Sequence, residues 1–357
     1  MIIGYETDNV LIAAQKRMAM VFNEFDRVVV SVSGGKDSTV IRALALAEAA
    51  KLGRTVELFF LDQEAEYEST ISVMREWMAD PAITPRWFQV PIRMTNATSH
   101  KDYWLNAWGP GEEWVRPKEP NSIHEALDDC PQRFYEFFDW YERKATVKTA
   151  FIVGLRSRES FNRFRSVTKN AGYKDWAWTT STKNPLAVRA YPIFDWTFGD
   201  VWKYIQDNGL TYNVHYDRMF AKHGVNIRNM RVSCLIHEKS FHCLADLQEF
   251  EPDTYDRLIK RLAGVHCAAL YVGEDYVFSA NKLPDGFATW RAFRDYLLET
   301  TPLDKVERFR KRFAGQETDE ETCRLQAKQV LINDWENNVA ITQHKLSAMR
   351  ERWWNVL

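Results

Sequence analysis

Hydrophobic and polar positions along the first 210 residues follow two periods that alternate. Apolar residues at helical spacing predict an amphipathic helix over 7–24, and the β-branched run 27–32 predicts a strand buried on both faces. Further helices are expected over 38–50, 67–78, 134–144 and 198–208, and further strands over 55–61, 86–90, 149–153 and 188–194. This rhythm indicates βαβ units. We therefore expect an α/β fold with an open parallel sheet and helices on both faces.

Two stretches depart from this rhythm. Residues 94–128 contain three tryptophans among glycines and prolines, which indicates an irregular insertion or lid. Beyond about residue 216 the pattern is mainly helical, and its clearest helix is expected over 325–339. We therefore predict an α/β domain over 1–218, with the Trp-rich insertion 94–128, and a mainly helical C-terminal domain over 219–357.

Composition narrows the class of protein. The 357 residues are 45% hydrophobic and 27% charged, which is ordinary for a folded chain, and the net charge of −2 provides no overall basic field for nucleic acid. The five cysteines are an odd number, no signal peptide begins the sequence, and no apolar run reaches the ~18 residues of a membrane span. We expect reduced thiols, a cytoplasmic location and no membrane partner.

A local concentration of cations is compatible with a nucleic-acid or protein partner, although such a run is as often a solvated face. The cations are Lys144, Lys148, Arg156, Arg158, Arg163, Arg165, Lys169 and Lys174. Aromatic residues make up 14% of the chain, and they would serve either core packing or stacking on bases.

The loop 33–38 joins the first buried strand to the next helix and has the composition of a phosphate cradle. Gly34 and Gly35 allow a tight turn and close approach, while N–H groups at the helix start point toward an anion. Lys36 adds a positive charge, and Asp37 suits Mg²⁺. Two hydroxyl donors complete the loop, Ser33 and Ser38. The loop is not a Walker A motif, because Val30 and Asp37 stand where that motif needs Gly and Ser or Thr.

Residues 31–38 resemble the PP-loop of ATP pyrophosphatases and phosphoadenosine phosphosulfate (PAPS) reductases. Three further stretches, 62–70, 154–160 and 191–205, resemble segments of the reductases, so the resemblance spans about residues 20–240. Residues 159–163 and the helical tail look closest to the IbrA/YbdN-like branch of this superfamily. The resemblance implies a HUP-like fold and binding of ATP or PAPS with Mg²⁺.

The nucleotide-binding residues follow from the loop, the resemblance and two strand ends. Asp62 and Arg156 come directly after strands, so they belong at the carboxyl edge where open α/β sheets bind ligands. Arg156 suits a phosphate or sulfate, or it forms a salt bridge to Glu159 or Asp195, and Asp62 is either a ligand contact or a helix cap. We expect catalysis by Lys36, Asp37 and Arg156, and nucleotide binding by Ser31, Ser33, Gly34, Gly35, Lys36, Asp37, Ser38, Asp62, Gly154 and Arg156.

The stretch 195–202 reads as structure despite its resemblance to the reductases. Thr197 is expected to cap the next helix, and Asp200 has the spacing of a capping box.

The cysteines depart from the reductase pattern. Those enzymes, as a family, use a Cys in a Glu-Cys-Gly-x-His segment near the C-terminus, and the nearest equivalent here, Cys323, has neither the Gly nor the His. Cys234, His237 and Cys243 are candidate Zn²⁺ ligands, and the alternative is buried thiols and a satisfied histidine. Cys234 is also a candidate carrier of sulfur.

Three functions remain open. The first is an ATP α-phosphate hydrolase that adenylates an acceptor and couples this to sulfur transfer. The second is a PAPS-binding sulfotransferase or reductase. The third is a non-catalytic nucleotide-binding protein with a nucleic-acid or protein partner. The sulfur donor and the acceptor nucleophile are unknown.

Overall fold

The computed structural model describes residues 7–99, 102–124, 127–168, 172–225, 230–232, 234–237, 243–271, 280–316, 318–337 and 339. The chain forms two compact units, Met1–Arg93 with Asn106–Ser233 and Met94–Leu105 with Cys234–Leu357. The domain limits 1–218 and 219–357 stay a prediction, because compactness does not measure whether a segment folds independently.

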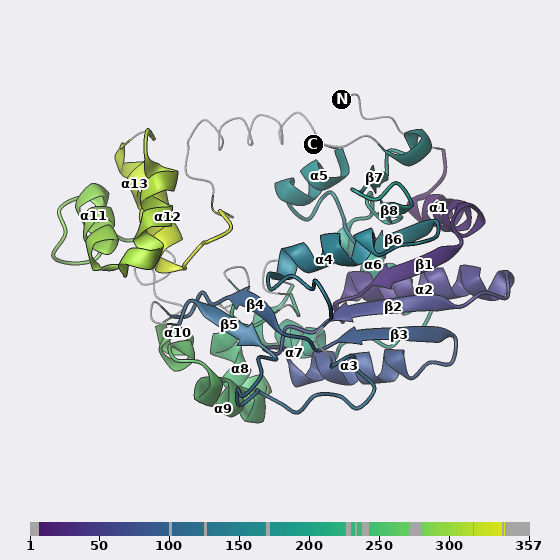
Figure 1. The fold of residues 1–357 in the computed structure, drawn as a ribbon, viewed down its shortest axis with the longest axis horizontal. Helices are drawn as coiled ribbons and strands as arrows, with labels where there is room; N and C mark the ends of the chain where they lie inside the picture. Colours follow the sequence, from purple (N-terminus) through teal and green to yellow (C-terminus); the bar gives the residue numbers. More distant parts are fainter. Residues whose placement is uncertain are drawn as a thin grey trace. The chain divides into compact units, whose positions relative to one another are not determined.

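The first unit is built on a six-stranded sheet in the order β3-β2-β1-β6-β8-β7 (Figure 1). Its strands are β1 Arg27–Ser31, β2 Val56–Leu61, β3 Ile83–Phe88, β6 Thr149–Val153, β7 Thr179–Ser181 and β8 Ala187–Ala190. All neighbours pair in parallel except β7, which lies antiparallel to β8. The parallel sheet is as predicted. The three-residue β7 was missed, because so short a run has no measurable period.

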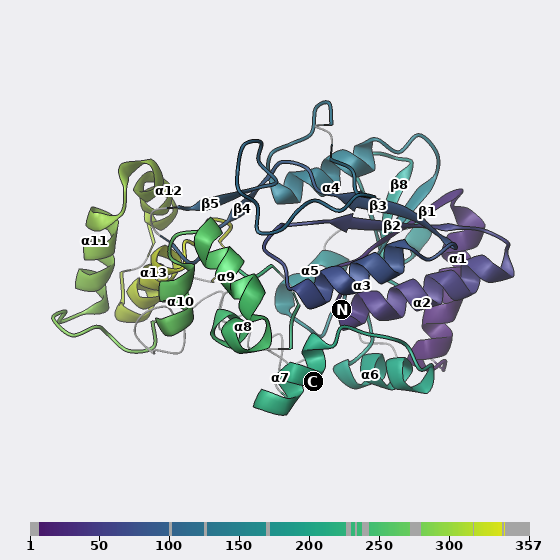
Figure 2. The same cartoon turned by 90° about the horizontal axis from the view of Figure 1, so that it is seen from below.

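Helices cover both faces of this sheet, as the sequence predicts (Figure 2). On one face the apolar core joins Val28 and Val30 of β1 to four helices. These are α1 Val10–Glu24, α2 Lys36–Lys51, α3 Glu68–Met78 and α6 Phe198–Asp207. The opposite face is covered by α4 Phe134–Arg143, and α5 Phe161–Thr168, the 3₁₀ turn Tyr173–Asp175 and α7 His215–His223 complete the unit.

The strand order reverses at β1, which has β2 on one side and β6 on the other. In the register, Ser31 pairs with Phe59 of β2 and with Val153 of β6. The segments that follow β1 and β6 therefore leave the sheet side by side. Ligands of open α/β sheets bind at such a switch point, outside the carboxyl ends of the strands.

The stretch before α6 is structural, as the sequence predicts. Thr197 caps α6, and Asp200 bonds back to it in a complete capping box. The Asp195 carboxylate accepts two hydrogen bonds from Arg17, at 2.8 and 2.7 Å. Trp196 is buried and donates to a carbonyl of α1. These contacts fix α6 against α1.

The second unit is mainly helical, also as predicted. Its helices are α8 Leu244–Phe250, α9 Pro252–Arg261, α10 Val265–Tyr271, α11 Trp290–Thr300, α12 Leu303–Phe313 and α13 Glu320–Leu331. The prediction of a helix over 325–339 is wrong in its limits. Helix α13 begins at Glu320, five residues before the predicted start, with Asp319 as its N-cap. It ends before Asn333, whose φ of 47° is left-handed. The short strands β4 Ile92–Thr95 and β5 Trp104–Ala107 pair where the chain passes from one unit to the other and back.

A membrane span would need a longer and more apolar helix than any found in the described ranges.

Candidate active site

The loop after β1 has the geometry of an anion cradle. Gly34 adopts φ 70°, and a Cβ there would lie 2.8 Å from the Thr70 side chain, so only glycine fits. The Ser38 hydroxyl accepts from the N–H of Ser33 at 3.0 Å, and the two hydroxyls are 3.2 Å apart. Helix α2 begins at Lys36 with Gly35 as an N-cap that offers no side chain. The positive end of the helix dipole therefore faces the loop.

Three charged residues meet beside this loop. The Asp37 carboxylate accepts a hydrogen bond from Arg156 Nε through one oxygen, and its other oxygen lies 3.2 Å from Lys36 Nζ. Burial alone would raise the pKa of Asp37, but Lys36 and Arg156 hold it below its usual range. Burial would lower the pKa of Lys36, but Tyr216 and Asp37 raise it. The structure thus brings together the three predicted catalytic residues, and their contacts favour the charged forms of Lys36 and Asp37.

Gly154 brings the segment after β6 against the loop. A Cβ at this position would lie 3.2 Å from the carbonyl carbon and oxygen of Asp37. A larger residue would push the two segments apart, since these contacts are with backbone atoms. Gly154 therefore allows Arg156, two residues later, to reach Asp37.

Tyr216 of α7 is a site residue to which the sequence assigned no role. Its hydroxyl accepts a hydrogen bond from the backbone N–H of Lys36 at 3.1 Å. The Lys36 ammonium lies 5.5 Å from the Tyr216 ring and 5.6 Å from the Phe198 ring. These distances allow cation–π attraction. Tyr216 lies within the span of about residues 20–240 that resembles the reductases but outside the three stretches that carry the resemblance.

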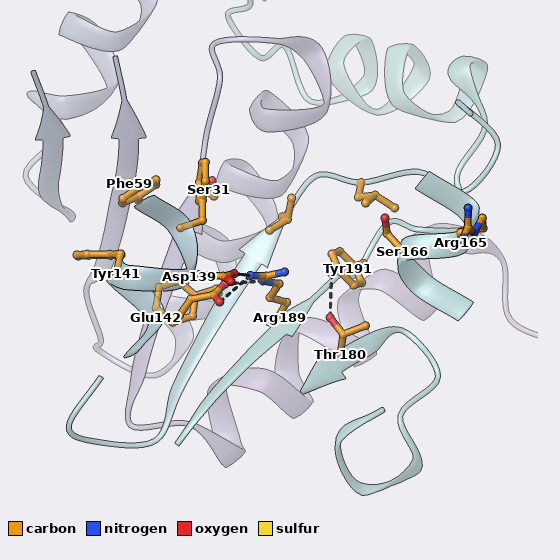
Figure 3. Close-up of a pocket in the computed structure, with 14 residues that line it drawn as sticks. Ser31, Phe59, Asp139, Tyr141, Glu142, Arg165, Ser166, Thr180, Arg189 and Tyr191 are labelled. Carbon is orange, nitrogen blue, oxygen red and sulfur yellow. Dashed lines mark hydrogen bonds and ion pairs between the residues drawn. The ribbon is translucent and has the colours of Figure 1, made fainter. Parts of the chain in front are cut away.

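A pocket of about 770 Å³ adjoins the loop on the sheet face covered by α4 (Figure 3). Ser31, where the loop begins, lines it, and so does Leu155, between Gly154 and Arg156. Its volume falls within the range of small-molecule sites. Five aromatic residues line it, which the sequence did not predict because they come from four different elements or their ends. These are Phe59, Phe138, Tyr141, Phe151 and Tyr191.

Five polar side chains of the pocket, Asp139, Glu142, Thr180, Arg189 and Tyr191, are paired with one another. Arg189 donates to Glu142 at 2.5 and 2.7 Å and to Asp139 at 2.8 Å. The Tyr191 and Thr180 hydroxyls are 2.9 Å apart (Figure 3). Aromatic rings beside paired polar groups suit a flat heterocycle with hydrogen-bonding edges better than a bare anion.

Asp62 lies at the predicted edge but is fully buried. Both carboxylate oxygens lie 2.6 Å from Arg116, and one also accepts from Trp87 and Gln89 at 2.9 Å. It does not cap α3, whose N-cap is Tyr67. The geometry therefore makes Asp62 an anchor for the Trp-rich insertion, with its oxygens used by protein donors.

The predicted metal ligands fare differently from the loop. In the part of the chain that the structure describes, which includes Cys234, His237 and Cys243, no three His, Cys, Asp or Glu side chains are placed to hold a metal ion. The prediction of a zinc site thus has no geometric support, and the burial of Cys234 and Cys243 agrees with core thiols. Asp37 alone, between two cations, does not make a Mg²⁺ site without oxygens from a phosphate.

Arg294 lies 3.5 Å from the sulfur of Cys323 and favours the thiolate, but burial outweighs this effect. Cys323 is fully buried, and burial raises its pKa, which disfavours the thiolate.

Three cations of the predicted basic stripe are paired with carboxylates, and Lys169 lies outside the described residues. Lys148 and Lys174 both pair with Glu24, at 3.3 and 2.6 Å, and Arg163 pairs with Glu159 at 3.0 Å. Paired cations attract a polyanion less than the sequence count suggests.

The chain is similar in sequence to known proteins over most of its length. The phosphoadenosine phosphosulfate reductase domain matches residues 27–227, and a domain of unknown function, DUF3440, matches 224–351. The uncharacterized protein YbdN of Escherichia coli K12 is 29% identical over 322 residues, which are 86% of this chain and 79% of YbdN. An adenosine 5′-phosphosulfate reductase of Geobacillus thermodenitrificans is 24% identical over 225 residues, 62% of this chain and 81% of that enzyme. A crystal structure of PAPS reductase from Candida auris with phosphate covers 60% of this chain and 93% of its own, with 15% identity and a TM-score of 0.35.

Proposed function

Because the chain belongs to the phosphoadenosine phosphosulfate reductase domain family, we propose that it is an enzyme that activates an acceptor at the α-phosphate of ATP and couples this to sulfur transfer. The observation that carries the proposal is the convergence of Lys36 and Arg156 on Asp37 beside the glycine loop. Two fixed cations and a helix N-terminus stabilise charge that develops on a phosphoryl group.

The nucleotide would lie across the switch point. Its phosphates would occupy the loop 33–38, and its adenosine would occupy the aromatic pocket that begins at Ser31. The pocket and the loop share a boundary at Ser31 and Leu155, so one ligand can reach both. ATP would bring Mg²⁺ on its phosphate oxygens, and Asp37 is the carboxylate at hand for that ion.

The proposed reaction has two steps. An oxygen of the acceptor attacks the α-phosphorus, the bond from that phosphorus to the bridging oxygen breaks, and pyrophosphate leaves with the electron pair. A sulfur nucleophile then adds to the adenylated carbon of the acceptor, and AMP leaves. Lys36 and Arg156 would neutralise the leaving pyrophosphate, and catalysis would rest on positioning and charge.

Calorimetric titration with ATP and Mg²⁺, and separately with PAPS, tests the proposal while pyrophosphate release is followed in parallel. ATP binding with formation of AMP and pyrophosphate supports it. Binding of PAPS without use of ATP would replace it by sulfonucleotide chemistry, and nucleotide binding without turnover would favour a non-catalytic role. Reduction is placed second because Cys323 lacks the Gly and the His of the reductase segment and is also fully buried. The cytoplasmic location is part of the same proposal, since the substrates are intracellular nucleotides.

A further inference from the structure

Three arginines converge on one carboxylate next to the loop. Glu159 lies 3.9 Å from Arg156, 3.0 Å from Arg163 and 3.9 Å from Arg231. These arginines come from the segment after β6, from α5 and from the stretch after α7. Arg156 is also paired with Asp37, so among the described residues two carboxylates, Glu159 and Asp37, face Lys36 and these three arginines. Positive charge is therefore still in excess at this point.

The Glu159 carboxylate is a poor match for these cations. Its oxygen Oε2 is buried but accepts no hydrogen bond among the described residues, although it is the atom nearest to Arg163 and Arg156. A buried carboxylate held by ion pairs without well-aligned donors loses much of their stabilising energy. A tetrahedral anion has more oxygens and suits the guanidinium fork better.

Arg156 connects this cluster to the phosphate loop. Its Nε donates to Asp37, while its Nη2 is the atom nearest to Glu159. The anion position at the loop and the position of Glu159 are therefore separated by a single guanidinium group. Two anionic groups that follow each other directly in one ligand would fill both positions.

We propose that Glu159 occupies the subsite of the second of two consecutive anionic groups, and that the ligand displaces it and takes over Arg163 and Arg231. The ligand class is one with a diphosphate or a phosphosulfate, and a single phosphate would not reach this subsite. The inference rests on the proposed function for the identity of the nucleotide but not for the subsite itself, because inorganic pyrophosphate has the same chemistry.

The test measures binding of pyrophosphate, ATP, PAPS and AMP by calorimetry in the full chain and in Glu159→Gln, Arg231→Gln and the control Arg158→Gln. Arg158 is an exposed neighbour outside the cluster. Glu159→Gln removes the competing charge and is expected to tighten pyrophosphate binding several-fold. Arg231→Gln is expected to weaken it by about tenfold, the size of a lost charge-assisted hydrogen bond. AMP binding and the melting temperature should change little in either.

The outcomes separate the two proposals. Tighter pyrophosphate binding in Glu159→Gln supports the subsite even if ATP and PAPS fail to bind, which would sink only the proposed function. If Arg231→Gln weakens binding of ATP and of PAPS to different degrees, the nucleotide whose binding falls more is the one whose second anionic group occupies the subsite. Weaker or unchanged pyrophosphate binding in Glu159→Gln, or equal effects of Arg231→Gln on AMP and pyrophosphate, overturns the subsite.

Discussion

The backbone N–H of Lys36 donates a hydrogen bond to the Tyr216 hydroxyl across 3.1 Å, between residues 180 positions apart in the sequence. This N–H belongs to the first turn of α2, where donors have no partner within the helix. Tyr216 thus takes the place that a phosphate oxygen would take if the proposed function holds.

Tyr216→Phe should therefore tighten nucleotide binding and lower the stability of the protein without ligand. Without the hydroxyl, the Lys36 N–H lacks its acceptor until a phosphate arrives, and one such bond is worth about 1 kcal/mol, or roughly fivefold in affinity. Calorimetry with ATP and thermal unfolding without ligand measure the two effects. Tyr212→Phe is the matched control, since its hydroxyl bonds to Asp217 on the exposed side of the same segment. A loss of affinity in Tyr216→Phe would mean that the hydroxyl contacts the ligand.

Lys36→Met should lower ATP affinity by about tenfold or more and abolish turnover. The substitution keeps the length of this buried side chain and removes the charge that would meet the phosphate. Lys51→Met, at the exposed end of the same helix, is the control and should leave binding unchanged. Both variants should keep the circular dichroism of the parent. Normal turnover in folded Lys36→Met would remove the loop from the active site.

A larger side chain in the aromatic pocket should distinguish binding of the nucleoside from binding of the phosphates. Val153 lines the pocket beside Ser31, so Val153→Phe is expected to weaken ATP binding about tenfold or more while pyrophosphate binding stays within twofold. The exposed Val147, just before the same strand, provides the control Val147→Phe. Equal ATP affinity in both variants would place adenosine elsewhere.

What the sequence predicted well is local along the chain. The loop 33–38 and the segment from Gly154 to Arg156 each lie within a few residues of a strand that is mainly apolar, and these strands are neighbours in the sheet, which brings the two segments together. Tyr216 and the pocket depend on residues that are distant in sequence, and no period in the chain relates them. The end of α13 was misjudged for a local reason. Apolar residues continue past Leu331, but the left-handed backbone of Asn333 prevents the helix from continuing.

Asp62 shows why a correct position does not by itself define a role, since the predicted helix cap is wrong and the predicted nucleotide contact stays a prediction. It follows a strand at the ligand-binding edge, as predicted, but its partner Arg116 is 54 positions away in the irregular insertion. No pattern in residues 94–128 signalled a buried cation, and an aspartate at a strand end looks the same whether it binds a ligand or an arginine. The ion pair is decided by tertiary packing, which only the structure supplies.

The buried Glu66, four residues after Asp62, should make the stability of the protein depend on pH. Burial, and to a lesser degree the charge of Asp62, raises the pKa of Glu66 well above its usual 4.5. The folded protein therefore keeps a proton that the unfolded chain has released, and the free energy of unfolding should fall as pH rises above 4.5 toward the folded pKa. One proton corresponds to about 1.4 kcal/mol per pH unit. Urea unfolding of the parent and of Glu66→Gln, at steps of about one pH unit between pH 5 and pH 8, measures this pH dependence. As pH rises, the parent should lose stability relative to Glu66→Gln. Glu68 is a more exposed neighbour that pairs with Arg75, and the control Glu68→Gln should show no such trend relative to the parent. Parallel pH profiles for the parent and Glu66→Gln would mean that Glu66 is ionised in the folded protein, and then Arg116 would have to be its counter-ion as well as that of Asp62.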